Sequence, residues 1–437
     1  MQADEKNRAT MNPFILYGGG KISFELPKDW NLLTFADLGS PQDLGDPADL
    51  TRRALENPIG CDPLRERISL SDTVAVLIED LTRASPKKIL LTALLEELKR
   101  IGVARENIRI VIALGTHRPL SSEEMEAVFG RDLMSGYSFF NHDCRAPDMA
   151  PVARLDTGRE VKINRLVHEA SFRIGIGSIF PHPMNGFGGG GKILFPGVAD
   201  FESIFEHHLR YAFHERAGLG RLTDNPFYEN VCAVARAAGL HFVVNSILDH
   251  TDRLCAVVSG DPVEAHLAGI RKCTGMISKE FPGKSDLTII TSFPYSEGPQ
   301  IMKPLAPASM VTREGGTIIL FADCSGNLPE PFIAALERFH RHHSNDLLKG
   351  MRDCFARNEL IMEGAAIDFN MAAGMALTAQ HAFRIIIVSR DIPREKVERM
   401  GFVYGSDMQE AFDLSNKGCP RPDVHIIPSG GILLPVL

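Results

Sequence analysis

The chain has 437 residues, a length that exceeds the usual size of a domain with a single hydrophobic core and favours two or three domains. Hydrophobic residues make up 44% of the chain and charged residues 23%, values that are typical of globular proteins and exclude a largely disordered chain. The formal net charge of −8 argues against a protein whose main task is to bind nucleic acid or anionic lipid.

Targeting signals and cysteine pairs are not apparent in the sequence. No apolar run approaches the roughly 18 residues that a membrane-spanning helix needs, and the first residues, MQADEKNRAT, do not resemble a secretory signal. The eight cysteines form no C-x-x-C pair, which argues against a zinc knuckle or a dithiol redox site. We therefore expect a cytoplasmic protein with reduced cysteines and with neither a membrane nor a nucleic acid as partner.

The first half of the chain alternates short apolar runs with helical patterns. Apolar, β-rich runs predict buried strands at residues 73–78, 108–114 and 172–179. Leucines recur at helical spacing over 86–100, and Ser121–Phe129 begins with a serine and acidic residues, as helices do. This βαβα order predicts parallel strands joined by crossover helices. Residues 241–262 are interpreted as a small antiparallel element.

The same alternation resumes in the second half, after a Pro-Gly-Lys turn near residue 283. Strands are predicted there at residues 287–292, 316–322, 383–389 and 424–428. We therefore expect two domains, an N-terminal α/β domain over 1–275 and a C-terminal α/β domain over 286–437 that closes over the cleft. The expected fold class is α/β, with two lobes of mostly parallel, doubly wound, Rossmann-like sheets plus the small antiparallel element. A ligand is expected in the crevice where the strands' carboxyl ends meet.

Polar residues follow each predicted strand of the first lobe. The first strand runs into Asp80, Thr82 and Arg83, the second into His117, and the third into His182. Histidine titrates near neutrality, so two histidines that face one cleft could alternate as acid and base. The Asp80 and Arg83 side chains could form only an exposed ion pair, or they could position a carboxylate or phosphate, which the arginine fork suits.

A glycine run follows the third strand. Residues 186–192 read GFGGGGK, which has the spacing of a phosphate-binding P-loop, but Ile193 stands where a hydroxyl must bind Mg²⁺. Such a run can bring backbone N–H groups close to a phosphate, and it can also serve as a hinge. Lys192 favours a phosphate-bearing ligand, whereas ATP hydrolysis is not expected.

Further candidates lie on predicted helices and turns. His207 and His208 follow a helical pattern, and adjacent helical residues point about 100° apart, so only one of the two can face a site. Gln300 and Lys303 are expected on a short turn of the second lobe. The His340–His343 cluster is expected at an exposed helix end.

Together these motifs resemble the nickel-dependent lactate racemase family, which includes other 2-hydroxy acid racemases and epimerases. The resemblance rests on DLTR at 80–83, GTHR at 115–118 and the block GSIFPHPMNGFGGGGKILFPGVADFESIFEHH at 177–208. The Gln300 and Lys303 pair adds to it, and the similarity spans most of the chain.

The resemblance implies a cofactor, a nickel-pincer nucleotide. This is a pyridinium-3,5-bisthiocarboxylic acid mononucleotide that holds Ni(II) through two sulfur atoms and a ring carbon. In that family the lysine matching Lys192 forms a thioamide bond to the cofactor, and the histidine matching His208 binds nickel. The cofactor site would then lie in the domain over 1–275, and separate biosynthetic proteins would supply the cofactor.

The resemblance also implies the roles of the other candidates. His117 and His182 match two acid/base histidines that act on a small 2-hydroxy acid. Further contacts to the cofactor are implied for Asp80, Thr82, Gly188, Gly189, Gly190 and Gly191. Contacts to the substrate are implied for Arg83, Gln300 and Lys303.

The implied reaction, inversion at C2 by reversible hydride transfer, is chemically consistent with these residues. The C–H bond beside a hydroxyl and a carboxylate is too weak an acid for an unaided side chain, and its removal as hydride needs an electrophile that no amino acid supplies. A tridentate pincer and one imidazole complete the four-coordinate plane that Ni(II) favours. Two alternatives are a kinase- or ligase-like enzyme that uses the glycine run, and a non-catalytic protein that carries the cofactor.

Overall fold

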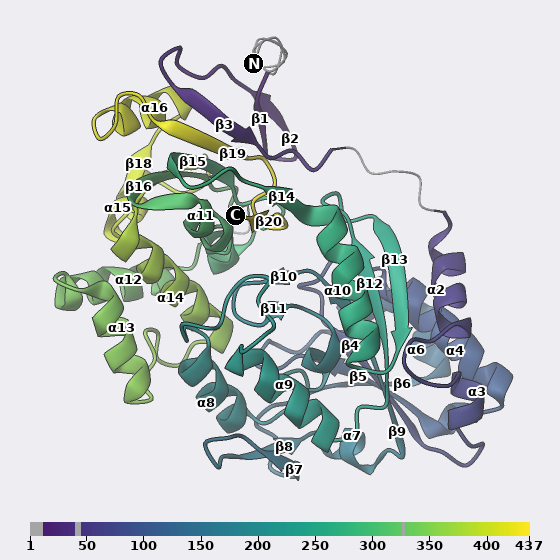
Figure 1. The fold of residues 1–437 in the computed structure, drawn as a ribbon. Helices are drawn as coiled ribbons and strands as arrows, with labels where there is room; N and C mark the ends of the chain where they lie inside the picture. Colours follow the sequence, from purple (N-terminus) through teal and green to yellow (C-terminus); the bar gives the residue numbers. More distant parts are fainter. Residues whose placement is uncertain (1–11, 40–44, 326–327) are drawn as a thin grey trace. The chain divides into compact units, whose positions relative to one another are not determined.

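The computed structural model describes residues 12–39, 45–325 and 328–437 (Figure 1). The chain divides into two compact units, each with its own six-stranded sheet. We call Ser40–Met276 the first unit, and Met1–Gly39 together with Ile277–Leu437 the second unit.

The sheet of the first unit has the strand order β13-β12-β9-β4-β5-β6, in which only β13 is antiparallel to its neighbour. Its strands are β4 (Val74–Glu79), β5 (Ile108–Ala113), β6 (Ser138–Asn141), β9 (Phe172–Ile179), β12 (Phe242–Leu248) and β13 (Leu254–Gly260). Within this sheet the chain passes from β4 through β5 to the edge strand β6, and it then crosses to β9 on the other side of β4. The strand order therefore reverses between β4 and β9, and such a switch point opens a crevice at the carboxyl ends of the strands.

Helix α4 (Lys87–Ile101) shows why the crossover helices form where the sequence predicts them. Its buried leucines, which include Leu90, Leu94 and Leu98, pack in one core with residues of β4 and β5. Each such side chain contributes about 1.5–3 kcal/mol by leaving water. The helix ends at Gly102, whose φ of 98° suits a left-handed cap.

The remaining elements of the first unit surround this sheet. The helices are α2 (Pro47–Glu56), α3 (Leu64–Arg67), α5 (Ser122–Phe129), α6 (Arg131–Gly136), α7 (Arg165–Glu169), α8 (Phe201–Tyr211), α9 (Pro226–Ala237), α10 (Glu264–Ile277) and the 3-10 turns η1 (Arg105–Asn107) and η2 (Gly190–Ile193). Two antiparallel pairs complete it: β7 (Ala150–Arg154) with β8 (Glu160–Ile163), and β10 (Pro181–His182) with β11 (Gly186–Phe187).

The sheet of the second unit is entirely parallel, with the order β18-β17-β16-β15-β19-β3. Its strands are β3 (Asn31–Phe35), β15 (Ser285–Thr291), β16 (Thr312–Phe321), β17 (Arg384–Val388), β18 (Val403–Gly405) and β19 (Asp423–Ile427). Its helices are α11 (Leu305–Val311), α12 (Glu330–His343), α13 (Leu347–Ala356), α14 (Ile367–Ala382), α15 (Arg394–Arg399), α16 (Met408–Asn416) and the 3-10 turn η3 (Gly298–Met302). Two small sheets pair β1 (Phe14–Tyr17) with β2 (Gly20–Ser23), and β14 (Ser278–Glu280) with β20 (Leu434–Val436).

This architecture confirms the expected α/β class with two mostly parallel sheets. Residues 241–262 form the expected antiparallel pair, β12 with β13, but this pair belongs to the main sheet, because β12 also pairs in parallel with β9. The N-terminal boundary also differs, because β3 pairs with β19 and joins the second unit. A strand whose only partner lies almost 400 residues away along the chain leaves no local pattern that would reveal it.

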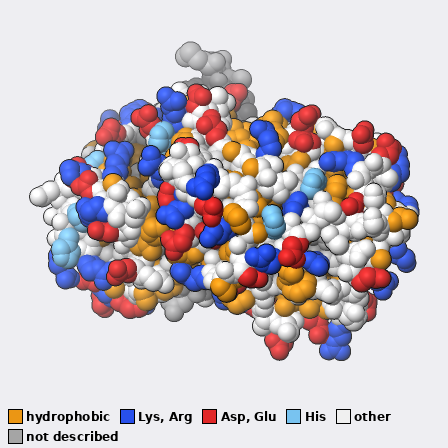
Figure 2. Space-filling view, turned by 90° about the horizontal axis from the view of Figure 1, so that it is seen from below, with side chains coloured by type: hydrophobic (Ala, Val, Ile, Leu, Met, Phe, Trp, Pro, Cys, Tyr) orange, Lys and Arg blue, Asp and Glu red, His pale blue; other side chains and the backbone are white. Residues whose placement is uncertain are grey.

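Acidic and basic side chains are interspersed on the face drawn in Figure 2. Among the described residues, no helix is both long and apolar enough to cross a bilayer.

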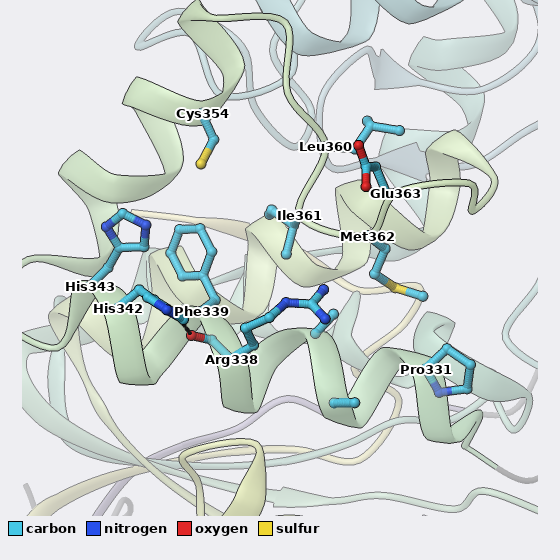
Figure 3. A pocket seen from close by; sticks show the side chains of 12 residues that line it. Pro331, Arg338, Phe339, His342, His343, Cys354, Leu360, Ile361, Met362 and Glu363 are labelled. Carbon is cyan, nitrogen blue, oxygen red and sulfur yellow. Dashed lines mark hydrogen bonds between the residues drawn. The ribbon is translucent and has the colours of Figure 1, made fainter.

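A cavity of about 590 Å³ lies within the second unit, between α12, α13 and the segment 360–363 (Figure 3). Its lining includes Arg338, Phe339, His342, His343 and Met362. None of the residues expected to contact cofactor, nickel or substrate lines it, so this cavity is distinct from the candidate site.

Two glycines of β9 provide a matched pair for a stability prediction. A Cβ at Gly175 would lie 2.3 Å from Cγ2 of Ile193, whereas a Cβ at Gly177 would meet its neighbours at 3.4 Å or more. We expect Gly175→Ala to lower the free energy of unfolding by about 1–3 kcal/mol, because the added methyl group would overlap the buried Ile193 side chain. Gly177→Ala should change it by less than about 0.5 kcal/mol. Urea denaturation of both variants measures this, and equal effects would contradict the close packing of β9 on the glycine run.

Candidate active site

The switch point of the first sheet brings together most of the predicted site residues. Asp80 directly follows β4, His117 comes four residues after β5, and His182 lies in β10, just after β9. These strands are parallel and neighbouring, so their carboxyl ends meet at one edge of the sheet. The segment that contains the glycine run and Lys192 packs on β9. A Cβ added at Gly175 of this strand would meet Ile193, and one added at Gly177 would come close to Gly189.

Asp80 and His117 form a hydrogen-bonded pair. Oδ2 of Asp80 contacts Nδ1 of His117, and Oδ1 accepts hydrogen bonds from Thr82, at 3.0 Å from the backbone N and 2.6 Å from Oγ1. A carboxylate at Nδ1 places the ring proton there, so Nε2 of His117 keeps a lone pair and can act as a base. The guanidinium of Arg83 lies over the Phe180 ring, 4.9 Å from its centroid.

The Asp80 carboxylate is stabilised in its charged form. Burial alone would raise its pKa, but the hydrogen bond and charge of His117, together with Arg83 and Thr82, outweigh burial and hold the pKa well below its usual range. Lys87 also lies close, and its Nζ donates to the carbonyl oxygen of Arg83. The loop after β4 is therefore fixed at both ends.

This shift predicts how stability depends on pH. A carboxyl group whose folded pKa is depressed contributes stability that is present above its unfolded pKa of about 3.9 and lost as the pH falls toward the folded value. We expect Asp80→Asn to lower the free energy of unfolding by about 1.5–3 kcal/mol at pH 7, and by progressively less below about pH 4. Urea denaturation at several pH values measures this, with exposed Asp132→Asn as the control. A deficit that stays constant with pH would contradict the assignment.

His182 and Lys192 form the second contact of the site. Nδ1 of His182 accepts hydrogen bonds from the backbone N–H groups of Met184, at 3.3 Å, and Asn185, at 3.1 Å. Nε2 of the same ring lies 3.2 Å from Nζ of Lys192. Burial, followed by the charge of Arg83, lowers the pKa of Lys192 to about 7.

The glycine run is packed against protein atoms and does not form an open loop. A Cβ at Gly188 would meet the Phe180 ring at 2.6 Å, and one at Gly190 would meet His266 at 2.5 Å. The N–H of Gly188 donates to the Phe180 carbonyl, and the N–H of Gly190 donates to Oδ1 of Asn245. A P-loop presents such N–H groups at the start of a helix, but here only the four-residue turn η2 follows them.

Several residues that support this loop were not predicted from the sequence. His266 donates from Nε2 to the Gly188 carbonyl at 2.8 Å, and Asn245 holds Gly190. Glu79 accepts from both the N–H and the hydroxyl of Ser178, at 3.0 and 2.9 Å. The only signal available was a polar residue within an apolar strand, as in FVVNSIL of β12.

The two adjacent histidines of α8 donate hydrogen bonds from different ring nitrogens. His207 donates from Nε2 to the Phe227 carbonyl at 3.1 Å and is fully buried among aromatic rings. His208 donates from Nδ1 to the Ile204 carbonyl at 2.9 Å, so its Nε2 keeps a lone pair. Burial, followed by the charge of Lys192, lowers the pKa of His208 to about 3, and the ring is therefore neutral at physiological pH.

Within the described part of the chain, protein side chains alone do not form a conventional metal site. Among the described residues, no group of three or more His, Cys, Asp or Glu side chains is placed to hold a metal ion. A metal bound mostly by atoms of a cofactor needs only one protein ligand, and His208 has the neutral ring and the open nitrogen that such a ligand requires.

Gln300 and Lys303 lie together in the second unit. They flank the end of η3, and Nζ of Lys303 donates to Oε1 of Gln300 at 2.9 Å. Tyr295, which the sequence analysis did not single out, lies beside them, with its ring centroid 4.5 Å from Nζ of Lys303. An amide, an ammonium group and a phenol are thus available together to bind a carboxylate or a hydroxyl.

Known proteins are similar to this chain in sequence and in fold. Residues 17–220 match the family described as lactate racemase N-terminal domain. The chain is 30% identical over 317 residues to the lactate racemase of Thermoanaerobacterium thermosaccharolyticum, covering 71% of this chain and 74% of that protein. It is 29% identical over 278 residues to the lactate racemase of Lactiplantibacillus plantarum, covering 62% and 64%.

Solved structures extend this similarity to almost the whole chain. The apoprotein structure of the T. thermosaccharolyticum lactate racemase superposes with a TM-score of 0.85 at 25% identity, over 98% of this chain and 100% of that chain. A protein from Thermotoga maritima shares the fold, with a TM-score of 0.65 at 19% identity, over 91% and 100%. The matched range 17–220 contains every candidate residue from Asp80 to His208.

Proposed function

Because the chain belongs to the lactate racemase family, which is a family of isomerases, we propose that it inverts C2 of a small 2-hydroxy acid. The proposed reaction is a reversible hydride transfer to a nickel-pincer nucleotide, with His117 and His182 as the acid/base residues. The observation that carries the proposal is the Asp80–His117 pair at the switch point, because its carboxylate leaves Nε2 of the histidine as a base.

The residues of the first unit fit the proposed cofactor. His208 would hold nickel through Nε2, since its Nδ1 is committed to the Ile204 carbonyl. Lys192 would anchor the nucleotide, because a buried amine with a pKa of about 7 is about half neutral at pH 7, and the neutral form is nucleophilic. When bound, the cofactor supplies the hydride acceptor that no side chain provides.

The side chains then have distinct tasks. His117 takes the hydroxyl proton of one enantiomer at Nε2, and the Asp80 carboxylate stabilises the imidazolium that results. Arg83 would bind the substrate carboxylate through its guanidinium fork, and the family resemblance implies substrate contacts for Gln300 and Lys303.

His182 serves the opposite enantiomer and starts from a different state. Its Nδ1 accepts two backbone hydrogen bonds, so the ring proton is on Nε2 and the ring is set to donate. For Nε2 to accept a proton, Nδ1 must carry the other one, and the hydrogen bonds from Met184 and Asn185 must first open. The two histidines are therefore not equivalent in the protein before it binds a ligand.

The two alternative functions have less support. The glycine run donates its N–H groups to protein acceptors and leads into η2, which argues against phosphoryl transfer at a P-loop. An intact Asp80–His117 pair would have no purpose in a protein that only carries the cofactor.

Chiral chromatography of a panel of enantiopure 2-hydroxy acids tests the proposed function. The protein is produced together with the proteins that assemble the cofactor, which are its proposed maturation partners. At least one acid should be converted to a mixture of both enantiomers. Inactivity on the whole panel, with nickel bound and with maturation verified on a known lactate racemase, would overturn the proposal.

A further inference from the structure

We propose that Lys87 is a positioning residue of the active site, whose side chain fixes the backbone of Arg83 so that the Arg83 guanidinium can meet the carboxylate of the substrate. This inference deepens the proposed function and rests on it for the role of Arg83. Three features carry it: the place of Lys87 in the fold, the contact that its amine makes, and the way the Arg83 side chain is held.

Lys87 occupies a position that is locally unfavourable for a lysine. It is the first residue of α4 and is only 5% exposed, whereas its neighbour Lys88 is exposed. Burial removes the ammonium group from water, and the start of a helix is the positive end of the helix dipole. Neither a capping side chain at Pro86 nor an acidic residue in the first turn offsets this. Such a local conflict is expected where a residue is retained for function rather than for stability.

The amine of Lys87 is committed to the loop that carries Arg83. Its Nζ donates a hydrogen bond to the carbonyl oxygen of Arg83, and its backbone N–H donates to the carbonyl oxygen of Ser85 at 2.8 Å. The carboxylates of Glu79 and Asp80 lie near enough to attract the ammonium charge. The loop is therefore closed twice, once through the backbone and once through the lysine side chain.

The other end of the Arg83 side chain is held from a different strand. Its guanidinium lies over the ring of Phe180, 4.9 Å from the centroid, and Phe180 directly follows β9. The carbonyl oxygen of Phe180 accepts a hydrogen bond from the N–H of Gly188 at 2.8 Å, which ties this residue to the glycine run. Arginine binds a carboxylate through two parallel N–H groups, so the alignment of its planar fork decides how tightly it binds.

Holding Arg83 at both ends prepares it for a carboxylate. With the backbone fixed by Lys87 and the guanidinium placed on Phe180, the side chain has little conformational freedom left to lose when the substrate binds. Loss of the Nζ contact would release the backbone of Arg83 and restore that freedom. The expected defect is therefore weaker binding of the substrate carboxylate, with proton transfer at His117 and nickel binding at His208 unaffected.

The substitutions Lys87→Met and Lys88→Met test this assignment on adjacent lysines of one helix. Methionine retains most of the stem of lysine but cannot donate a hydrogen bond. In the matured enzyme, Lys87→Met should raise KM for a 2-hydroxy acid by at least about tenfold with kcat within about threefold of the wild type, because carboxylate binding is the same in the ground state and the transition state. Lys88→Met should leave both constants and the nickel content unchanged. A wild-type KM in Lys87→Met would overturn the proposal.

A double-mutant cycle with Arg83→Gln separates positioning from a general loss of structure. If Lys87 acts through Arg83, adding Lys87→Met to Arg83→Gln should lower kcat/KM by less than about a further twofold, because the interaction that it supports is already lost. An equally large loss in both backgrounds would show that Lys87 acts independently of Arg83, and the proposal would fail.

Amide hydrogen exchange of the full-length protein without cofactor gives a readout that does not depend on activity. In Lys87→Met, the amides of residues 81–85 should exchange at least about tenfold faster than in the wild type and in Lys88→Met, with the urea midpoint little changed, because only a local closure is lost. Exchange at the wild-type rate would contradict the proposal whether or not the enzyme racemises a 2-hydroxy acid. Inactivity of the wild type on every acid would instead contradict the proposed function.

Acetylation of the wild-type protein keeps the proposal testable if Lys87→Met does not fold. The probe is N-acetoxysuccinimide, and fragmentation mass spectrometry distinguishes the two adjacent lysines. Lys87 should be acetylated at least about tenfold more slowly than Lys88, because a buried, hydrogen-bonded amine reacts only when the structure opens locally. Equal rates would show that the amine does not hold the Arg83 carbonyl, and the assignment would be wrong.

Discussion

Replacing His208 with glutamine should remove nickel from the matured protein, whereas replacing its neighbour His207 with glutamine should not. The Nδ1–H of His208 is held by the Ile204 carbonyl, which leaves Nε2 as a ligand, and a glutamine amide is a far weaker ligand for Ni(II) than an imidazole. His207 uses Nε2 to donate to the Phe227 carbonyl, a hydrogen bond that a glutamine amide can replace. The two variants differ by one position on the same helix, so they share most non-specific effects.

Elemental analysis of both purified variants measures the effect. The wild type and His207→Gln should carry close to one nickel per chain, and His208→Gln should lose more than about nine-tenths of it. Retention of nickel by His208→Gln, with loss in His207→Gln, would assign the ligand to the other histidine. Circular dichroism of both variants excludes unfolding as the cause.

Replacing His117 with alanine should lower the rate of racemisation by about 10²–10⁴-fold, while nickel stays bound. The size of the effect follows from the loss of the positioned base, whose Nδ1 contacts the Asp80 carboxylate. Rates at saturating and at low substrate concentrations separate the loss of the base from weaker binding. The loss should appear in kcat with KM little changed, because His117 acts on the proton in transfer.

The control for this prediction is His142→Gln. His142 is a buried histidine of the same unit whose Nε2 donates to the Ala199 carbonyl, and its substitution should affect stability more than turnover. Full activity of His117→Ala, with nickel content unchanged, would show that another group takes the hydroxyl proton.

Strands and helices could be predicted where a short stretch of sequence has a clear hydrophobic pattern. The strands β4, β5 and β9 and the helix α4 lie within one or two residues of their expected positions, because apolar runs and leucine spacing report burial directly. The pairing of β3 with β19 was not predictable, since it joins segments almost 400 residues apart. The parallel pairing of β12 with β9 was not predicted, because the apolar run of β12 does not show which strand it pairs with.

Some residues of the candidate site could likewise be predicted from the sequence, and others could not. Asp80, His117 and His182 could be predicted because parallel strands bring their carboxyl-terminal residues to one edge. Asn245 and His266, which hold the glycine run, were not predicted because they come from β12 and α10, far along the chain. The ring orientations of His207 and His208 depend on carbonyl groups that only the folded helix brings into reach.

Inversion of an enantiopure 2-hydroxy acid in deuterium oxide tests the central claim most directly. If hydrogen leaves C2 as hydride and returns to the same carbon, the product enantiomer should keep its original hydrogen while the hydroxyl proton exchanges freely. Proton NMR combined with chiral chromatography measures both quantities in one sample. We expect a racemic product with no deuterium at C2. Deuterium at C2 that accumulates in step with inversion would show proton abstraction from carbon, and it would contradict the hydride mechanism.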